Sequence, residues 1–206
     1  IGSALQTIVE EMSRALMRAG YSTSIKERMD ISTAIMDEDG VLLAQAAHQP
    51  CHLGSLLGIA QRVLQVTPRD QVRPGDLFVG NDAYEGGGTH LPDIVLAEPV
   101  FVAGKIVAWA INTAHHADFA DRGHAHIYQE GLRIPPIRLY RAGVLQERQI
   151  LDLDVNVLET RLAGEVHLDF VVHDVKRLAL QSDTGAAELG AVVSVAGLRD
   201  AGGVLG

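Results

Sequence analysis

Residues 93–116, DIVLAEPVFVAGKIVAWAINTAHH, decide the fold that the sequence predicts. Two apolar runs flank the turn sequence Ala-Gly-Lys at residues 103–105, which is typical of two strands joined by a tight turn. Pro99 is predicted to lie at a bend or an edge of the sheet, because proline lacks a ladder donor. In a hairpin that turns near Gly104, residue 93 lies opposite about residue 115, so the end of the second strand returns to the start of the first.

The residues before this hairpin predict two helices, a second hairpin and a short strand. Residues 4–19 and 53–66 space their apolar side chains at the helical period, and Gly20 ends the first helix. Residues 31–45 alternate apolar and other side chains around a DEDG turn, which predicts a hairpin. Residues 73–82, RPGDLFVGND, indicate a turn followed by a short buried strand.

The residues after the central hairpin carry weaker patterns. Residues 119–130 are polar and lack periodicity, so a loop is predicted there. Residues 130–145, EGLRIPPIRLYRAGVL, indicate a proline-stiffened extended segment and a further turn. Residues 148–182 return to helical spacing, and residues 185–206, rich in Ala, Gly and Val, are predicted to be a small-residue helix or a weakly ordered end.

Together these patterns predict an α+β fold, in which β-hairpins and a mixed sheet pack with amphipathic helices and the C-terminal part is helical. The predicted division is an α+β domain over residues 1–160 and a helical C-terminal extension over residues 161–206. The chain has 206 residues and is 47% hydrophobic, which suffices for one substantial core.

Composition excludes several classes of function. The net charge of −9 argues against a nucleic-acid surface, which needs a basic patch. The sequence has no apolar run long enough for a membrane span and no signal-peptide pattern at residues 1–20. A single cysteine, Cys51, excludes an intrachain disulfide and favours a cytoplasmic location. Its flanking residues do not favour the alternative, a nucleophilic thiolate.

Histidines and aspartates gather in the middle of the chain. Seven of the nine histidines lie between residues 48 and 126, interspersed with Asp82, Asp93 and Asp118. Imidazole and carboxylate ligands without thiolates suit a divalent Zn, Mn or Fe ion, and two His with one carboxylate leave coordination positions open. The alternative is that these histidines bind no metal and are ordinary surface or core residues.

The predicted hairpin selects among these candidates. Pro92 stiffens the segment that carries His90 and Asp93, and the returning strand brings one of His115 and His116 beside them. Adjacent residues of a strand point to opposite faces, so one of the two can join the site easily. The sequence therefore predicts a metal site made of His90, Asp93 and one histidine of the pair.

Three glycines, residues 86–88, precede this site. They match neither GxxxxGK[ST] nor a GxGxxG that opens a helix, so a nucleotide site is not predicted here. The glycines are predicted to let the backbone turn sharply or approach a substrate closely, which makes Gly87 and Gly88 candidate substrate-binding residues.

Four segments, taken in order, resemble the hydantoinase B/5-oxoprolinase family, which includes the N-methylhydantoinase B subunit and the related large subunit of acetone and acetophenone carboxylases. They are IKERMDISTAIMDEDGVLLAQAAHQPCHLGSL (25–56), PGDLFVGNDAYEGGGTHLPDIVLAEPVF (74–101), NTAHHAD (112–118) and QEGLRIPPIRLY (129–140). The resemblance covers roughly residues 3–160. Several motifs in the same order are far more specific than any one of them.

The resemblance implies ATP-dependent chemistry in a hetero-oligomer. A hydantoinase A-type partner subunit is expected to bind ATP and phosphorylate the substrate, and the B part then completes the hydrolysis of a cyclic amide. The alternatives are a subunit of an acetone carboxylase-type enzyme, which acts on a ketone, and a truncated subunit that only assembles with a partner. Family members are much longer than 206 residues, so a fragment, a split subunit and a reduced relative are all open.

Carried onto this sequence, the resemblance implies a divalent metal held by His90, Asp93 and His115. His116 and Asp118 are then candidates for orienting the ligands or for acid–base catalysis. Asp82 is a further catalytic candidate and Asn81 a candidate substrate contact, with turn capping as the alternative for both. The segment after HHAD lacks a PGSMP-like stretch that the family usually has, which puts one wall of the site in doubt.

Overall fold

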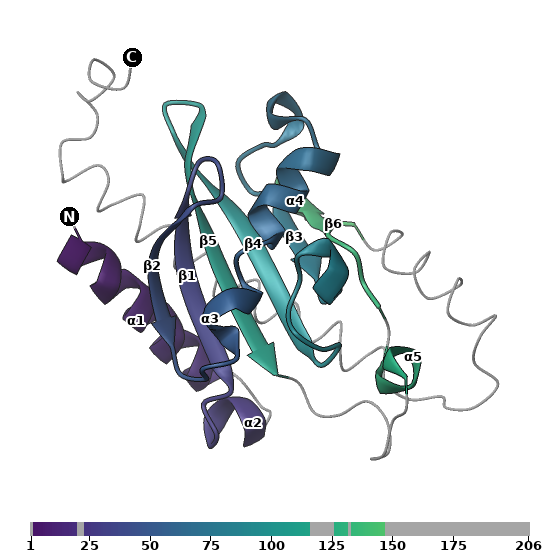
Figure 1. The fold of residues 1–206 in the computed structure, drawn as a ribbon. Coiled ribbons are helices and arrows are strands. Elements are labelled where there is room, and N and C mark those ends of the chain that lie inside the picture. The colour runs from purple at the N-terminus through teal and green to yellow at the C-terminus, as the bar shows by residue number, and fades with distance from the viewer. Residues whose placement is uncertain (1, 20–22, 116–125, 132, 147–206) are drawn as a thin grey trace.

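The computed structural model describes residues 2–19, 23–115, 126–131 and 133–146. Their centre is one seven-stranded sheet in the order β2-β1-β5-β4-β3-β6-β7, and Figure 1 shows helices on both of its sides. The strands are β1 (Ile31–Asp37), β2 (Leu42–Ala47), β3 (Leu77–Gly80), β4 (Asp93–Val102), β5 (Lys105–His115), β6 (Ile137–Arg141) and β7 (Val144–Leu145). The predicted α+β class is confirmed for this part of the chain.

The prediction of a mixed sheet is wrong, because every strand pairing in the described residues is antiparallel. Parallel neighbours need a long crossover connection, whereas tight hairpins join β1 to β2, β4 to β5 and β6 to β7. The hairpin patterns in the sequence do not predict which strands of different hairpins pair with each other. β1 pairs with β5, and β3 lies between β4 and β6.

The β4–β5 hairpin is the centre of the sheet, and its predicted register is confirmed. Val102 pairs with Lys105 at the turn, and Asp93 pairs with His115 at the far end. Ala103 and Gly104 form the turn with φ of 49° and 79°, the left-handed pair that matches the twist of a two-residue hairpin. Pro99 lies in β4 beyond the residues that pair with β3, where its missing N–H breaks no ladder bond to that strand.

Helices cover both faces of the sheet, which explains why β4 is almost continuously apolar instead of alternating. The helix α1 (Gly2–Ala19) packs on one face, where Val9 and Met12 meet Ile35 and Ala110. The helix α4 (Ile59–Val66) packs on the other face against a cluster that includes Trp109, and Figure 1 shows the two helices on opposite sides.

The short elements are α2 (Thr23–Lys26), α3 (His52–Ser55), η1 (Arg69–Gln71), η2 (Ala83–Glu85) and α5 (Ile127–Glu130). The single helix predicted over residues 53–66 is therefore two helices, separated at residues 56–58. Gly58 lies there against Gly86, with room for no side chain between the two backbones. The loop prediction for residues 119–130 is wrong at residues 127–130, which form α5, and residues 119–125 lie outside the described residues. The helical C-terminal part predicted over residues 148–182 and 161–206 also lies outside them.

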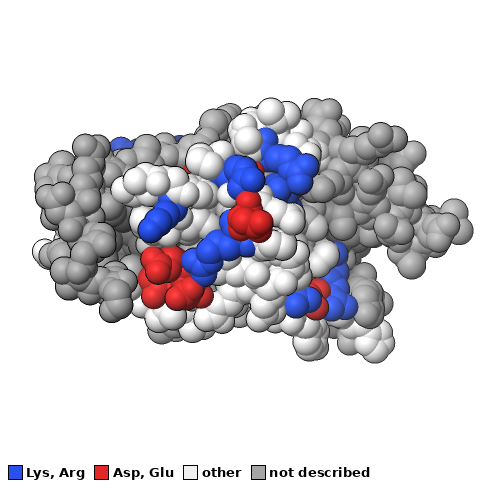
Figure 2. Space-filling model, turned by 90° about the horizontal axis from the view of Figure 1, so that it is seen from above, with Lys and Arg blue, Asp and Glu red and all other residues white. Residues whose placement is uncertain are grey.

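The surface seen in Figure 2 mixes both signs of charge. Lys and Arg side chains lie beside Asp and Glu on this face, and the described residues there form no uniformly basic surface. None of the helices in the described ranges is both long and apolar enough to cross a bilayer.

Candidate metal centre

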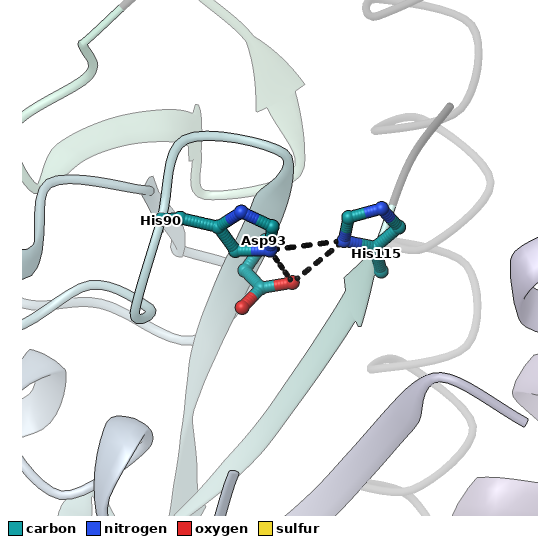
Figure 3. Close-up of side chains that lie close together, drawn as sticks. All are labelled: His90, Asp93 and His115. Atoms are coloured by element: carbon teal, nitrogen blue, oxygen red, sulfur yellow. Dashed lines mark hydrogen bonds and ion pairs between the residues drawn. The ribbon is translucent and has the colours of Figure 1, made fainter. Parts of the chain in front are cut away.

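Three side chains meet at the end of the sheet that is opposite the β4–β5 turn. His90 lies in the loop that leads into β4, Asp93 is the first residue of β4, and His115 is the last residue of β5. Figure 3 shows the two imidazole rings on either side of the Asp93 carboxylate. The sequence argument from the hairpin register placed these residues together, and in this structure they are in contact.

The three facing atoms form a nearly equilateral triangle. His90 Nε2 lies 3.1 Å from His115 Nδ1, His115 Nδ1 lies 3.2 Å from Asp93 Oδ1, and His90 Nε2 lies 3.3 Å from Asp93 Oδ1. Nitrogen and oxygen ligands about 2.1 Å from a metal are separated by about 3.0 to 3.4 Å when they are adjacent. The spacing and the donor types therefore fit a divalent cation bound by two histidines and one carboxylate.

Groups around the triangle fix the orientation of His90. Glu130, at the end of α5, faces His90 Nδ1 at 3.0 Å with one carboxylate oxygen and accepts the Leu91 N–H at 3.0 Å with the other. Because a carboxylate is an acceptor, His90 Nδ1 carries a hydrogen, and in the neutral ring the Nε2 lone pair faces the triangle. A carboxylate that orients a ligating histidine in this way is common at metal sites.

Asp93 is held through its second oxygen. Thr89 Oγ1 donates to Asp93 Oδ2 at 2.8 Å, so Oδ1 remains the oxygen that faces the two histidines. The side chains of Asp93, His115 and His90 are 1%, 14% and 39% exposed, respectively. Solvent therefore reaches the triangle from the His90 side, while Asp93 forms its buried floor.

The electrostatics of the triangle suit a cation. The hydrogen bond to Asp93 raises the pKa of His90 to about 9, against the effect of burial, and a separate hydrogen bond to the same carboxylate raises the pKa of His115. Burial acts to raise the pKa of Asp93, but hydrogen bonds from His115 and His90 outweigh it and hold that pKa below its ordinary range. Without a metal, a proton on His90 therefore occupies part of the space that a cation would take.

The predicted substrate contacts serve the loop in this structure. The Asn81 side chain donates to the Leu91 carbonyl at 2.8 Å and accepts the Ile134 N–H at 2.6 Å, which ties the ligand loop to the segment before β6. Asp82 caps η2 through the Tyr84 N–H and forms an ion pair with Arg133. These contacts match the turn-holding alternative, and the substrate-binding role of Asn81 and the catalytic role of Asp82 stay predictions.

The predicted role of the glycines as a turn has a structural reason. Gly88 has φ of +71°, and a Cβ at this position would lie 2.8 Å from the Asp93 carbonyl oxygen. A Cβ on Gly87 would lie 2.9 Å from the backbone of Gly80. The loop therefore packs its backbone directly on β3 and β4, and substrate contacts of Gly87 and Gly88 stay predictions.

His116 and Asp118, predicted to act in catalysis, lie outside the described residues. Cys51 is exposed, and burial together with the charges of Asp93 and Asp30 raises the pKa of its thiol, which disfavours a thiolate. The sequence argument missed Thr89, Glu130 and His52 as partners of the ligands. Thr89 precedes His90 in the sequence, but Glu130 and His52 reach the site through tertiary contacts that local sequence patterns do not predict.

Comparisons with known proteins place the chain. The family model of hydantoinase B/oxoprolinase matches residues 1–201. A 5-oxoprolinase of Pestalotiopsis fici is 36% identical over 151 residues, which cover 70% of this chain and 12% of that protein. The caprolactamase subunit beta of Pseudomonas jessenii is 32% identical over 175 residues, which cover 81% of this chain and 29% of that subunit.

Solved structures agree with the sequence comparisons. The crystal structure of the ATP-dependent caprolactamase from Pseudomonas jessenii matches with a TM-score of 0.77 and 27% identity, covering 97% of this chain and 34% of that one. An acetone carboxylase structure has the same TM-score at 16% identity, covering 96% of this chain and 26% of that one, which shows the fold alone. The chain thus spans about an eighth to a third of its oxoprolinase and caprolactamase relatives, and it belongs to the hydantoinase B/oxoprolinase family.

Proposed function

We propose that this chain forms the metal-binding part of a B-type subunit in an ATP-dependent enzyme that hydrolyses a cyclic amide. The observation that carries the proposal is the triangle of His90, Asp93 and His115, whose facing atoms lie 3.1 to 3.3 Å apart. Two relatives, 36% and 32% identical over the aligned residues, are a 5-oxoprolinase and a caprolactamase subunit, and both names denote cleavage of a lactam.

The described residues suggest how such a site works. A divalent cation bound there would polarise a carbonyl or phosphoryl oxygen or lower the pKa of a water. Glu130 keeps the Nε2 lone pair of His90 directed into the site, and Thr89 keeps one Asp93 oxygen out of it. The exposed edge of His90 leaves the substrate side open, whereas the buried Asp93 closes the floor.

ATP is proposed to bind to a partner. The sequence has no GxxxxGK[ST] motif, and its relative is named as the beta subunit of an enzyme whose structure is described as ATP-dependent. We therefore propose an A-type ATP-binding subunit as the partner, which phosphorylates the amide before the B part completes ring opening. The carboxylase alternative has support from the fold alone, because that likeness has 16% identity.

The first test is metal content. Purified wild type and His90→Ala are loaded with Zn²⁺, Mn²⁺ or Fe²⁺ in turn, passed through a desalting column and analysed for bound metal. The proposal expects about one ion per chain for wild type with at least one of these metals, and a loss of most of it in His90→Ala. Equal metal content in the two proteins would refute the metal site.

The second test is activity. The chain is co-purified with the ATP-binding subunit of its own source and supplied with ATP and either 5-oxoproline or caprolactam. Ring-opened product that disappears in His90→Ala supports the hydrolase. A tight complex whose activity survives that substitution supports a purely assembling role, and ATP-dependent incorporation of bicarbonate into a ketone supports the carboxylase.

A further inference from the structure

A buried histidine lies beneath the metal centre, on the side away from solvent. His52 is the first residue of α3, and 1% of its side chain is exposed. Its Nδ1 lies 3.2 Å from Ser32 Oγ of β1, and its Nε2 lies 3.5 Å from Asp30 Oδ1 and 3.7 Å from Asp93 Oδ2. The ring thus lies between the Asp93 carboxylate of β4 and Ser32 of β1, two strands that β5 separates in the sheet.

The groups around His52 Nε2 determine whether this nitrogen carries a hydrogen. Asp30 and Asp93 both present carboxylate oxygens to it, and an ionised carboxylate offers acceptors alone. A bare Nε2 lone pair between two anionic oxygens would be repelled by both, in a place with almost no solvent to screen the charges. His52 Nε2 therefore carries a hydrogen that points between the two carboxylates.

The backbone of His52 is also held in place by hydrogen bonds. The His52 carbonyl accepts hydrogen bonds from Gln45 Nε2 at 3.0 Å and from Ser55 Oγ at 3.3 Å. Together with the contact to Ser32, the bond from Gln45 holds the start of α3 against β1 and β2. If the Asp93 carboxylate rotates, its Oδ2 atom therefore moves away from the His52 Nε2–H, because the backbone of His52 is held in place.

We propose that His52 is a positioning residue of the metal centre, which holds the Oδ2 atom of Asp93 so that Oδ1 alone faces His90 and His115. Thr89 donates a hydrogen bond to the same Oδ2 atom at 2.8 Å, and the His52 Nε2–H adds an electrostatic attraction from 3.7 Å. A carboxylate that binds through one oxygen occupies one coordination position instead of two, which leaves more positions for substrate and water. The inference rests on the proposed metal site. It adds His52 as a residue that acts through Asp93 and is not itself a ligand.

The two amide side chains separate this role from simple packing. His52→Gln places an N–H donor near the position of Nε2, whereas His52→Asn places its amide near Nδ1 and leaves Thr89 as the donor to Asp93 Oδ2. Co²⁺ is titrated into both variants and wild type, with affinity and the visible absorption spectrum as readouts, and urea unfolding of the metal-free proteins measures stability. Ser32→Ala, which removes the contact to Nδ1 and leaves the ring in place, is measured alongside.

We expect His52→Asn to bind Co²⁺ about 10 to 100 times more weakly, with an altered spectrum, and His52→Gln to stay within a few fold of wild type. If His52→Asn does not fold, Ser32→Ala must show weaker binding for the inference to stand.

Unchanged affinity in a folded His52→Asn would overturn the inference while the metal site itself stands. An equal loss of affinity in His52→Asn and His52→Gln at equal stability would do the same. Two Co²⁺ per wild-type chain, with the second lost in His52→Asn, would also overturn it by making His52 a ligand. No Co²⁺, Zn²⁺ or Mn²⁺ bound to wild type would overturn the metal site and the inference together.

Discussion

Asp93 and His115 face each other as the last cross-strand pair of the β4–β5 hairpin, with Oδ1 and Nδ1 3.2 Å apart. A slip of one residue in this register would turn one of the two side chains to the opposite face of the sheet. The tight Ala103–Gly104 turn and the buried strands on both faces oppose such a slip. The geometry of the candidate metal centre therefore depends on a turn at the other end of the hairpin.

Removing His115 tests the ligand set directly. His115→Ala deletes one corner of the triangle, and we expect metal affinity to fall by more than about 100-fold, since the loss of a group that merely supports a ligand already costs 10- to 100-fold. Isothermal titration with Zn²⁺ or Mn²⁺ measures the change. His48→Ala, at an exposed histidine just after β2, is the matched control and should bind metal like wild type.

The hairpin explains how much of this site could be predicted from the sequence. Asp93 and His115 are 22 residues apart, but the turn signal near Gly104 converts that separation into a cross-strand pair. His90 follows because Pro92 confines the loop before the strand. The turn-forming role of the glycines was also apparent, although the backbones on which they pack were not.

The contacts that the sequence did not reveal come from tertiary packing. Glu130 reaches His90 across 40 residues, and His52 reaches Asp93 across 41, through elements whose placement depends on the whole sheet. The antiparallel pairing of β1 with β5 likewise joins two separate hairpins. Local periodicity carries no information on such neighbours. The fold class and the juxtaposition of His90, Asp93 and His115 were therefore predictable, and the residues around them were not.

Glu130 should control metal binding without touching the metal. In Glu130→Gln the side chain keeps one oxygen, so the contacts to His90 Nδ1 and the Leu91 N–H cannot both be satisfied as before. We expect an affinity loss of about tenfold, because His90 is then less firmly oriented. Metal titration is compared with Glu27→Gln, an exposed position before β1, and an equal effect in both would contradict the role of Glu130.

The pH dependence of the metal-free protein follows from His90. Its pKa is raised from an ordinary value of about 6.5 to about 9, so the folded state binds a proton more tightly than the unfolded state does. This contribution to stability is fully present below pH 6.5 and is lost as the pH rises through 9. We expect the free energy of unfolding, measured in urea with a chelator present, to fall across this range.

Metal binding should show the opposite trend. A cation must displace the proton from His90, so affinity should rise as the pH increases from 6.5 to 9. The variant His90→Gln cannot take up a proton. Its metal-free free energy of unfolding should therefore fall less than that of wild type between pH 6.5 and 9. A wild-type protein whose metal-free stability rises across this range would contradict the assignment of the proton to His90.

Gly88 tests whether the glycine run serves the loop. Gly88→Ala must accommodate a φ of +71° and a contact of 2.8 Å with the Asp93 carbonyl oxygen. We expect a loss of about 1 to 3 kcal/mol in stability, together with weaker metal binding, because the strain falls on a ligand residue. Gly54→Ala, where a Cβ meets nothing within 4 Å, is the control for urea unfolding and metal titration.

The β4–β5 turn predicts a stability change that is separate from the ligands. Ala103 has φ of 49°, a left-handed conformation that asparagine tolerates better than alanine and that β-branched residues resist. Ala103→Asn should therefore raise the free energy of unfolding by about 0.5 to 1 kcal/mol, and Ala103→Val should lower it by about 1 to 2 kcal/mol. Urea unfolding measures both, and metal affinity should stay unchanged in Ala103→Asn because the register is the same. A destabilised Ala103→Asn would show that this turn adopts another conformation in solution.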